Sequence, residues 1–264
     1  MKTSAPALLA LALMLVAIQS CKRQDIQTNR NLEQAHRPEL SHIMAPGMGT
    51  VGLIREGSIH IYYMDETGQW FADESSRFDI PENNRGVLAM GMGTIAVKQD
   101  KALDFYRLNP FNVWEKEAYL SFQLPKKHDR LMAMKMPWEI GIIAVETEGR
   151  VDFYYFYDQS WQYDPTASFT LPSGIKEYYP AGDMTLAVIY DDKLGLYYLS
   201  PEAGWQFMDQ ESYVLKLPEG YEGVVPYERR TIAVLKENSL LFYALDTEND
   251  RWVMLRDLKF DLPG

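Results

Sequence analysis

The sequence contains a single cysteine, Cys21, so no intramolecular disulfide can form. After residue 20, no apolar run approaches the roughly 18 residues that a membrane-spanning helix needs. No segment shows the apolar spacing of roughly 3.6 residues that marks an amphipathic helix. We therefore expect the chain to be stabilised by a β-sheet core, which the roughly 220 residues after the N-terminal segment are enough to bury.

Basic residues are outnumbered by acidic ones. The chain has 26 lysines and arginines against 37 aspartates and glutamates, which gives a formal net charge of −11. Loss of residues 1–20, discussed below as a signal peptide, would remove only one charge, that of Lys2, and bring the net charge to −12. Such a surface repels phosphate groups, so nucleic acid is not expected as a partner. The same balance argues against a polybasic contact with anionic lipid head groups.

The sequence also lacks the motifs of common catalytic and metal sites. It has no Gly-x-Ser-x-Gly segment, no phosphate-binding loop and no cysteine nucleophile. The four histidines, which show no metal-ligand spacing, are His36, His42, His60 and His128. We therefore predict no cofactor and no metal ion. A glycosidase pair of carboxylates stays open, because such a pair is defined by its separation in space.

The N-terminal segment has the features of an export signal. Lys2 is followed by an almost wholly apolar stretch over residues 5–18, which is too short for a permanent membrane span. The stretch ends in Ile18-Gln19-Ser20-Cys21, which resembles the lipobox of bacterial lipoproteins. The resemblance implies a signal peptide over residues 1–20 and lipidation of Cys21, which would become the mature N-terminus. An ordinary secretory signal followed by an unrelated cysteine is the alternative.

The segment that follows is polar and has little to bury. Residues 21–40 are therefore predicted to be a flexible tether. Lys22 stands where lipoproteins retained at the inner membrane carry aspartate, so the resemblance implies the outer membrane, with the periplasmic or surface side left open. Two or three acyl chains anchor a protein stably. Contact with the membrane is expected only through this lipid anchor.

The rest of the chain is an internal repeat. Its landmarks are Trp70, Trp114, Trp161, Trp205 and Trp252, which lie 44, 47, 44 and 47 residues apart. A period in this range indicates a propeller blade or another repeated unit. The repeat fills residues 41–264, which we treat as one domain.

Each unit contains four short segments with the residue types of β-strands, named here A to D in chain order. Strand B reads Thr-Ile-Ala-Val or similar, at residues 50–53, 94–97, 142–145, 185–188 and 231–234. Strand C alternates and ends in tyrosine, at Tyr62, Tyr106, Tyr154, Tyr197 and Tyr243. Strand D runs from the tryptophan to a Phe-x-Leu-Pro-like end. Strand A carries a small residue or proline at its third position, which suits the crowded strand nearest a central axis.

Four antiparallel strands repeated five times predict an all-β, five-bladed β-propeller. The unit resembles the blades of kelch and tachylectin-like propellers, which also end strand C in an aromatic residue and open strand D with tryptophan. The chain lacks the diglycine of kelch blades and the Trp-Asp pair of WD40 blades. A linear solenoid is the rival architecture. With no strand shared between the first and last units, the ring would close by packing blade five against blade one.

The tryptophan and tyrosine columns are interpreted as core, because residues repeated in every blade are what packing between blades needs. The methionines of strand A are likewise interpreted as filling space near the axis, with copper binding through thioethers as a remote alternative. Candidate ligand-binding residues lie where the repeat breaks. At the turns from strand A to strand B they are Trp138, Asp183, Glu228, Arg229 and Arg230. On the opposite face, which ligand sites of propellers favour, the loops from strand D to strand A supply Lys126, His128 and Arg130, a local basic spot on an acidic protein, and the aromatic Tyr221.

These observations favour a lipid-anchored, non-catalytic propeller of the bacterial cell envelope that binds a protein or a glycan. A glycan-active hydrolase that uses carboxylates near the axis, such as Asp183 and Glu228, is the alternative. An envelope scaffold that docks large partners is a third, and would require an exposed apolar patch of several hundred Å². The fold alone does not choose among them, because propellers host all three.

Overall fold

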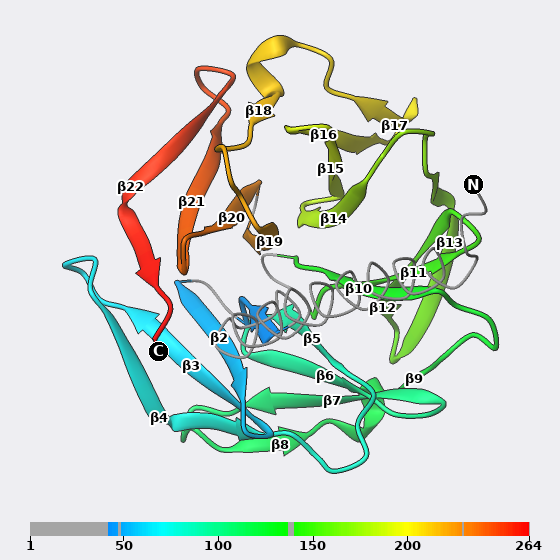
Figure 1. The fold of residues 1–264 in the computed structure, drawn as a ribbon. Helices are drawn as coiled ribbons and strands as arrows, with labels where there is room; N and C mark the ends of the chain where they lie inside the picture. The colour runs from blue at the N-terminus through cyan, green and yellow to red at the C-terminus, as the bar shows by residue number, and fades with distance from the viewer. Residues whose placement is uncertain (1–41, 47–48, 137–139, 229, 264) are drawn as a thin grey trace, which may run out of the picture. The chain divides into compact units, whose positions relative to one another are not determined.

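The computed structural model describes residues 42–46, 49–136, 140–228 and 230–263. This part of the chain is all-β and forms a β-propeller of five blades, as the sequence predicts (Figure 1). No helix in these residues has the length and apolar character that a membrane span requires. The predicted signal peptide, the lipidation site Cys21 and the predicted tether lie outside the described residues.

Each blade is an antiparallel sheet of four strands in the order A-B-C-D. The first is formed by β1 (Ile43–Met44), β2 (Thr50–Arg55), β3 (Ser58–Met64) and β4 (Trp70–Asp79). The second is formed by β5 (Val87–Gly91), β6 (Thr94–Lys98), β7 (Ala102–Leu108), β8 (Trp114–Lys116) and β9 (Phe122–Gln123). The third is formed by β10 (Arg130–Met134), β11 (Ile142–Thr147), β12 (Arg150–Tyr157) and β13 (Ser160–Thr170).

The last two blades repeat the arrangement. The fourth is formed by β14 (Glu177–Gly182), β15 (Thr185–Tyr190), β16 (Lys193–Ser200), β17 (Gly204–Phe207) and β18 (Leu215–Lys216). The fifth is formed by β19 (Gly223–Glu228), β20 (Thr231–Lys236), β21 (Ser239–Asp246) and β22 (Arg251–Asp261). Every strand pairs with neighbours from its own unit of the repeat, so the described chain closes its ring without a strand shared between the first and last blades.

Strand A is the innermost strand of each blade, as expected. Figure 1 shows β5, β10, β14 and β19 toward the centre and β4, β8, β13, β17 and β22 at the rim. Neighbouring A strands contact one another, β10 with both β5 and β14, and β19 with both β14 and β1. Strand B is covered on both faces by adjacent blades, and for this reason it reads as a continuous apolar run.

Strand D departs from the expectation in two blades. It is one continuous strand in blades one, three and five, but in blades two and four a 3-10 turn interrupts it, η2 (Ala118–Leu120) and η3 (Glu211–Tyr213). In the first blade the irregular point is held by Asp73, whose carboxylate accepts from the backbone N–H of Ser75 at 2.9 Å. Asp164 does the same for Thr166 in the third blade at 2.8 Å. Blades two and four carry Glu117 and Met208 at this position, but blade five carries Leu255 and keeps a continuous strand, so the aspartate alone does not decide the difference.

The repeated tryptophan packs into the preceding blade. Trp161 lies 5.4 Å from Phe105 and 5.7 Å from Phe122, both in blade two (ring centroids). The tyrosine at the end of strand C contacts the same strand-D phenylalanine from the other side, as Tyr154 does with Phe122 at 5.0 Å. Five apolar clusters result, one at each interface between blades. The interpretation of both aromatic columns as core is confirmed.

Four of the five tryptophans also donate a hydrogen bond across the interface. In each case the acceptor is a backbone oxygen of strand D in the preceding blade. It belongs to the residue two positions before the start of the Phe-x-Leu-Pro-like end. The Nε1···O distances are 2.9 Å from Trp114 to Ser76, 2.8 Å from Trp161 to Leu120, 2.7 Å from Trp205 to Ala167 and 2.9 Å from Trp252 to Tyr213. We call this tryptophan, with its ring contacts and its hydrogen bond, the indole wedge.

The interface that closes the ring differs from the other four. Its core is apolar, with Val51 and Leu53 of blade one packed in one cluster with Phe242 of blade five. The Arg55 guanidinium donates to the Pro263 carbonyl, which ties the end of the described chain to the first blade. The indole N–H of Trp70, however, is buried and has no hydrogen-bond partner among the described residues. Packing therefore closes the ring without the hydrogen bond that the other interfaces contain.

Substitution of Trp205 by Phe should destabilise the protein more than substitution of Trp70 by Phe. Both changes remove the same volume from an interface, but only Trp205→Phe leaves a buried carbonyl, that of Ala167, without its donor. We expect the free energy of unfolding to fall by about 1–3 kcal/mol more for Trp205→Phe than for Trp70→Phe. Denaturant unfolding followed by circular dichroism measures the difference. Equal losses would contradict a hydrogen-bonding role for the indole.

Candidate functional site

The predicted site residues fall at the two ends of the ring. The turns from strand A to strand B form one end, here called the A-to-B end, and the loops from strand D to strand A form the other, the D-to-A end. Strand β10 runs from one end to the other, with Arg130 at its start and Lys135 just beyond its last residue, Met134. Five residues of extended chain separate the two by roughly 16 Å, so the ends can be compared along a single strand.

At the A-to-B end, only part of the predicted group can be placed. Trp138 and Arg229 lie outside the described residues, and of Glu228 the structure describes the backbone in β19 but not the side chain. Asp183 is half-buried in a tight turn with a positive φ of 46°. The backbone N–H of Arg230 donates to Ala181 of the fourth blade at 3.0 Å. The predicted meeting of these five side chains, and the carboxylate pair of the hydrolase alternative, stay predictions.

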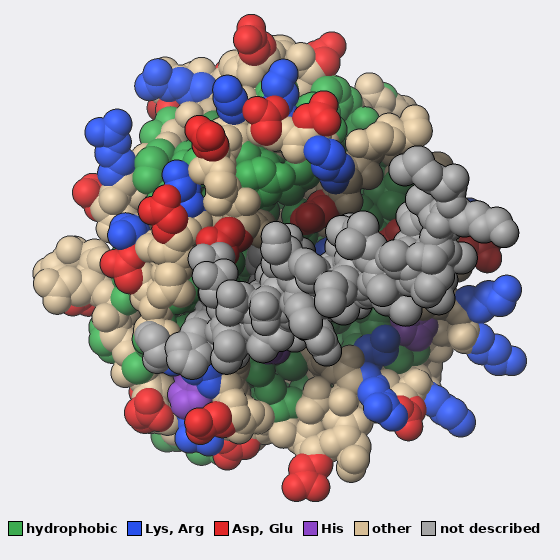
Figure 2. Space-filling model, in the orientation of Figure 1, with side chains coloured by type: hydrophobic (Ala, Val, Ile, Leu, Met, Phe, Trp, Pro, Cys, Tyr) green, Lys and Arg blue, Asp and Glu red, His purple; other side chains and the backbone are tan. Residues whose placement is uncertain are grey.

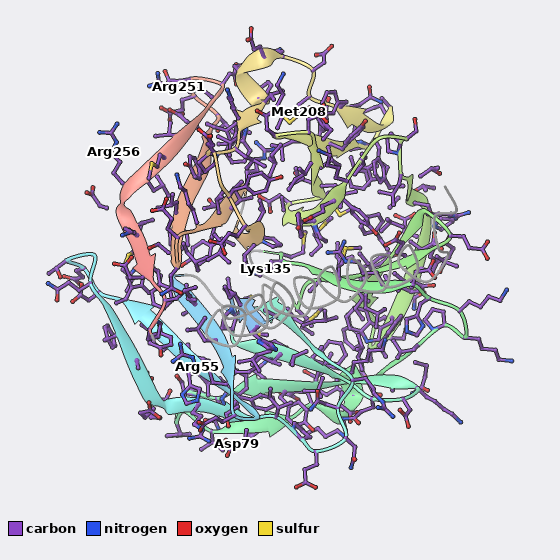
Figure 3. The ribbon with its side chains drawn as sticks, viewed as in Figure 1. Arg55, Asp79, Lys135, Met208, Arg251 and Arg256 are labelled. Atoms are coloured by element: carbon purple, nitrogen blue, oxygen red, sulfur yellow. The ribbon has the colours of Figure 1, made fainter. Side chains whose placement is uncertain are left out.

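A lysine that the sequence did not single out spans this end of the ring. The ammonium of Lys135, in blade three, donates to the backbone oxygens of Pro226 at 3.2 Å and Tyr227 at 2.6 Å, both in β19 of blade five. A Cβ placed on Gly91, in blade two, would lie 3.5 Å from the Lys135 stem. Figure 3 shows Lys135 near the centre of the ring. Lys135 thus joins innermost strands of non-adjacent blades at the A-to-B end.

The D-to-A end carries a different arrangement, built around Arg130. Its guanidinium donates to the backbone oxygen of Tyr178 at 3.2 Å, across the interface between blades three and four. The guanidinium carbon lies 5.2 Å from the ring centroid of Tyr178 and 5.5 Å from that of Tyr179. Contacts at these distances are cation–π interactions. We call Arg130, Tyr178 and Tyr179, with the carboxylates of Glu146 and Glu177, the Arg130 cluster.

The two carboxylates of the Arg130 cluster hold the tyrosine hydroxyls. Tyr178 donates to Glu146, and Tyr179 donates to Glu177. Burial and the hydrogen bond to Glu146 raise the pKa of Tyr178 far above its usual value, and burial and the bond to Glu177 do the same to the pKa of Tyr179. Both phenols therefore stay protonated, and both carboxylates keep an ordered donor.

Arg130 retains most of its hydrogen-bonding capacity. A guanidinium has five N–H donors, and within the described residues Arg130 makes the single bond to Tyr178 and no ion pair. Its charge nevertheless lowers the pKa of Tyr178, against the opposite effects of Glu146 and Asp129. Arg130 therefore gives the Arg130 cluster hydrogen-bond donors that no described residue uses.

The other residues predicted at the D-to-A end are distributed around the Arg130 cluster. Tyr221 is half-buried in the apolar cluster to which Tyr179 also belongs, and it contributes to the raised pKa of Tyr179. The His128 ring is turned to its own loop, with Nδ1 3.0 Å from the Pro125 oxygen. Lys126 is exposed, and no described contact joins it to Arg130. The structure thus brings Arg130 to both tyrosines and Tyr221 to Tyr179, and leaves Lys126 at the periphery.

The sequence reasoning missed Tyr178 and Tyr179 as site residues, although a signal was present. The first two positions of strand A are aliphatic or methionine in the other blades, for example Val87 and Leu88, and only the fourth blade has tyrosine at both. This departure from a repeated column was the available signal, although Tyr178 also packs in the apolar cluster between blades three and four.

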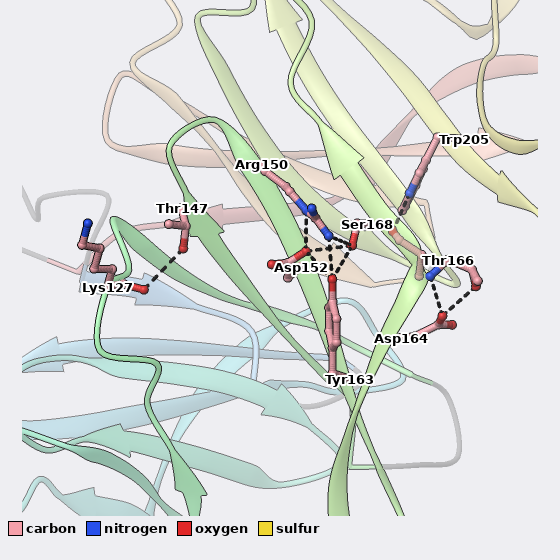
Figure 4. A network of polar contacts seen from close by, with 10 residues as sticks. Lys127, Thr147, Arg150, Asp152, Tyr163, Asp164, Thr166, Ser168 and Trp205 are labelled. Carbon is pink, nitrogen blue, oxygen red and sulfur yellow. Dashed lines mark hydrogen bonds and ion pairs between the residues drawn. The ribbon is translucent and has the colours of Figure 1, made fainter.

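A second polar network lies on the outer half of blade three. Arg150 donates to Asp152 at 2.9 Å, and the hydroxyls of Tyr163 and Ser168 complete the group (Figure 4). Its counterpart in blade one is Arg77 with Asp79 and Ser58. The arginine and aspartate lie on strand C in blade three and on strand D in blade one, and such a network that joins strands C and D near the surface is weak evidence of a ligand site. No group of three or more His, Cys, Asp or Glu side chains in the described residues is arranged to hold a metal ion.

The raised pKa of Tyr178 predicts a loss of stability at alkaline pH. The folded-state pKa lies above the value of about 10 for tyrosine in the unfolded chain, so the stabilisation is complete below pH 10 and is lost as the pH rises further. Between pH 9.5 and 11, Tyr178→Phe should reduce the fall in unfolding free energy by about 1 kcal/mol. Denaturant titrations at the two pH values measure it, with Tyr157→Phe, 70% exposed, as control. A fall equal to that of the unsubstituted protein would contradict the assignment.

No protein-family model matches the chain, and no curated protein matches its sequence. Its fold is similar to that of Kluyveromyces lactis Hsv2p, with a TM-score of 0.39 and 11% identity over 83% of this chain and 62% of that one. A functionally unknown protein from Desulfotomaculum acetoxidans aligns at a TM-score of 0.41 and 10% identity, over 80% and 67%. The WD40 domain of SCAP from fission yeast aligns at 0.40 and 10%, over 83% and 55%. This chain thus spans less than two thirds of Hsv2p and of the SCAP domain. Likenesses this distant say nothing of function, and the strand pairing alone carries the propeller assignment.

Proposed function

We propose that the chain is a lipid-anchored, non-catalytic binding propeller of the bacterial cell envelope, which recognises a glycan or a protein at the D-to-A end of its ring. The observation that carries the proposal is the Arg130 cluster. It lies at the inner edge of blades three and four, departs from the repeat at Tyr178 and Tyr179, and keeps unused hydrogen-bond donors on Arg130.

The asymmetry of the two ends supports the choice of face. At the A-to-B end, the Lys135 ammonium is already satisfied by backbone oxygens of the fifth blade, at 2.6 and 3.2 Å. At the D-to-A end, polar groups are held in place by one bond each and retain further capacity. Preorganised groups with spare donors and acceptors bind a ligand at a low cost in entropy.

The sequence supports a binding role without chemistry. The units of the repeat have nearly equal length and carry few insertions, whereas a catalytic centre on such a ring usually requires them. Release of products from an oligosaccharide panel by the purified full chain would contradict this part of the proposal. Dependence of that release on Asp183 and Glu228 would favour the hydrolase instead.

Site-specific photo-cross-linking in cells should identify the binding end. With benzoylphenylalanine in place of Lys126, at the D-to-A end, we expect a cross-linked adduct that is lost when Arg130 is also changed to Ala. With the same probe in place of Met92, 56% exposed at the A-to-B end, we expect no such adduct. Mass spectrometry of the purified chain reports both results. Adducts at position 92 alone, or at neither position, would overturn the proposed binding end.

Replacement of Cys21 by Ser should release the chain from the membrane. If the lipobox-like start is processed as in bacterial lipoproteins, the chain expressed in a bacterial host will carry acyl chains on Cys21 and sediment with the envelope. Cys21→Ser should yield a chain without acyl mass and in the supernatant. Intact-mass measurement after fractionation tests this. An unmodified Cys21, or equal sedimentation of both proteins, would contradict the anchor.

A further inference from the structure

The Arg130 cluster, together with the neighbouring residue Asp129, offers both hydrogen-bond donors and acceptors. Arg130 supplies the donors, and the carboxylates of Glu177 and Asp129, both exposed, supply acceptors. These acceptors are held by single bonds, Glu177 by the Tyr179 hydroxyl and Asp129 by the backbone N–H of Glu148 at 2.6 Å. Each carboxylate has two oxygens with roughly four lone-pair directions, so both can accept further bonds from a ligand.

The charge of the site selects among classes of ligand. Three carboxylates act on the two tyrosines: those of Glu146 and Asp129 raise the pKa of Tyr178, and that of Glu177 raises the pKa of Tyr179. Lys126 and Lys127, exposed in the loop that leads to Arg130, bring the positive charges to three against three negative ones, so a charged ligand of either sign would meet charges of its own sign. A cationic ligand would meet Arg130, which already occupies the space over both tyrosine rings. On the face viewed in Figure 2, acidic and basic side chains are likewise interspersed.

The exposed apolar side chains argue against a protein as the occupant. Large hydrophobic residues that are exposed in the described chain lie in strands C and D or in the turns of the A-to-B end, for example Phe111 at 86% and Tyr157 at 70%. None of those residues belongs to strand A or to the loops of the D-to-A end. The buried centre of a protein interface is depleted in charged residues and rich in aromatic anchors. The exposed residues around Arg130 are instead charged, and none of the described ones is a large hydrophobic residue.

We infer that the Arg130 cluster binds an uncharged saccharide, through the vicinal hydroxyls of a sugar ring. A hydroxyl both donates and accepts, so a pair of neighbouring hydroxyls can accept from the planar Arg130 fork and donate to Glu177 or Asp129. Arg130 is the principal donor, and Tyr179 positions Glu177 by its hydrogen bond. This inference rests on the proposed function and narrows its ligand to one class.

Binding should be measured with the full-length chain in a polyoxyethylene detergent, because sugar-based detergents would compete. The probes are three neutral trisaccharides, maltotriose, mannotriose and N-acetylated chitotriose, with trigalacturonate as the anionic counterpart and deacetylated chitotriose as the cationic one. Saturation-transfer difference NMR detects weak binding, and calorimetry gives its strength. We expect at least one neutral probe to bind, and the charged probes to bind less tightly or not at all.

Two variants locate the binding, and one controls for charge on the same face. Arg130→Lys keeps the charge but loses the planar fork, and should weaken binding about tenfold or more. Tyr179→Phe keeps the aromatic ring but removes the hydroxyl that donates to Glu177. It should weaken binding by a factor of about three to ten. Arg85→Lys alters an exposed arginine in the neighbouring loop, paired with Asp100 at 3.0 Å, and should leave binding unchanged. Thermal unfolding by circular dichroism confirms that each variant is folded.

Each possible result either supports or overturns the inference. Tighter binding of a charged probe, no binding of any neutral probe, or neutral binding that is indifferent to Arg130→Lys would each overturn it. An Arg130-dependent adduct at position 126 that proves to be a protein would overturn the ligand class and leave the proposed binding end intact. The absence of both the adduct and saccharide binding would remove the proposed function as well.

Discussion

The indole wedge is the interaction on which the rest of this ring depends. An isolated four-stranded blade exposes two apolar faces, and only the next blade can cover them. The wedge joins each blade to the one before it by ring contacts on phenylalanine and, at four interfaces, by a hydrogen bond of 2.7 to 2.9 Å to a backbone oxygen. Because a hydrogen bond is directional, it constrains the distance and the angle between neighbouring blades. The equal repetition of this geometry is what allows five blades to meet at an axis.

The ring must close between its last blade and its first, and in this chain apolar packing closes it. Trp70 keeps the ring contacts of the wedge, 5.9 Å from Phe242 and 5.1 Å from Phe260, but not the hydrogen bond. Arg55 and the apolar cluster shared by blades one and five replace part of what is missing. Lys135 adds a link that does not pass around the ring at all, because it joins the third blade to the fifth near the axis. Because the Lys135 ammonium is bonded at the A-to-B end, it is the Arg130 cluster at the D-to-A end that keeps hydrogen-bond donors for a ligand.

The fold was predictable because its determinants repeat. Each tryptophan, tyrosine and Thr-Ile-Ala-Val column appears five times, so the period and the strands could be located from the sequence alone. The 3-10 turns in blades two and four were not predicted, because strand D of these blades has the same tryptophan and the same kind of Phe-x-Leu-Pro end as in the other blades. The contacts within the Arg130 cluster were also not predictable from the sequence. Arg130 and Tyr178 stand 48 residues apart in sequence and meet only because adjacent blades place their A strands side by side. Arg130 and Tyr221 were predicted at this end of the ring from their places at or beside the loops from strand D to strand A, and their role in ligand binding stays a prediction.

Hydrogen exchange of the tryptophan indole N–H groups, followed by ¹H–¹⁵N NMR and assigned by single Trp→Phe changes, tests the central claim most directly. The account predicts slow exchange for Trp114, Trp161, Trp205 and Trp252, whose N–H groups are bonded across interfaces. It predicts distinctly faster exchange for Trp70, whose N–H at the closing interface has no partner among the described residues. Fast exchange of the first four, or an equally slow Trp70, would contradict a ring built from four hydrogen-bonded wedges and one packed seam.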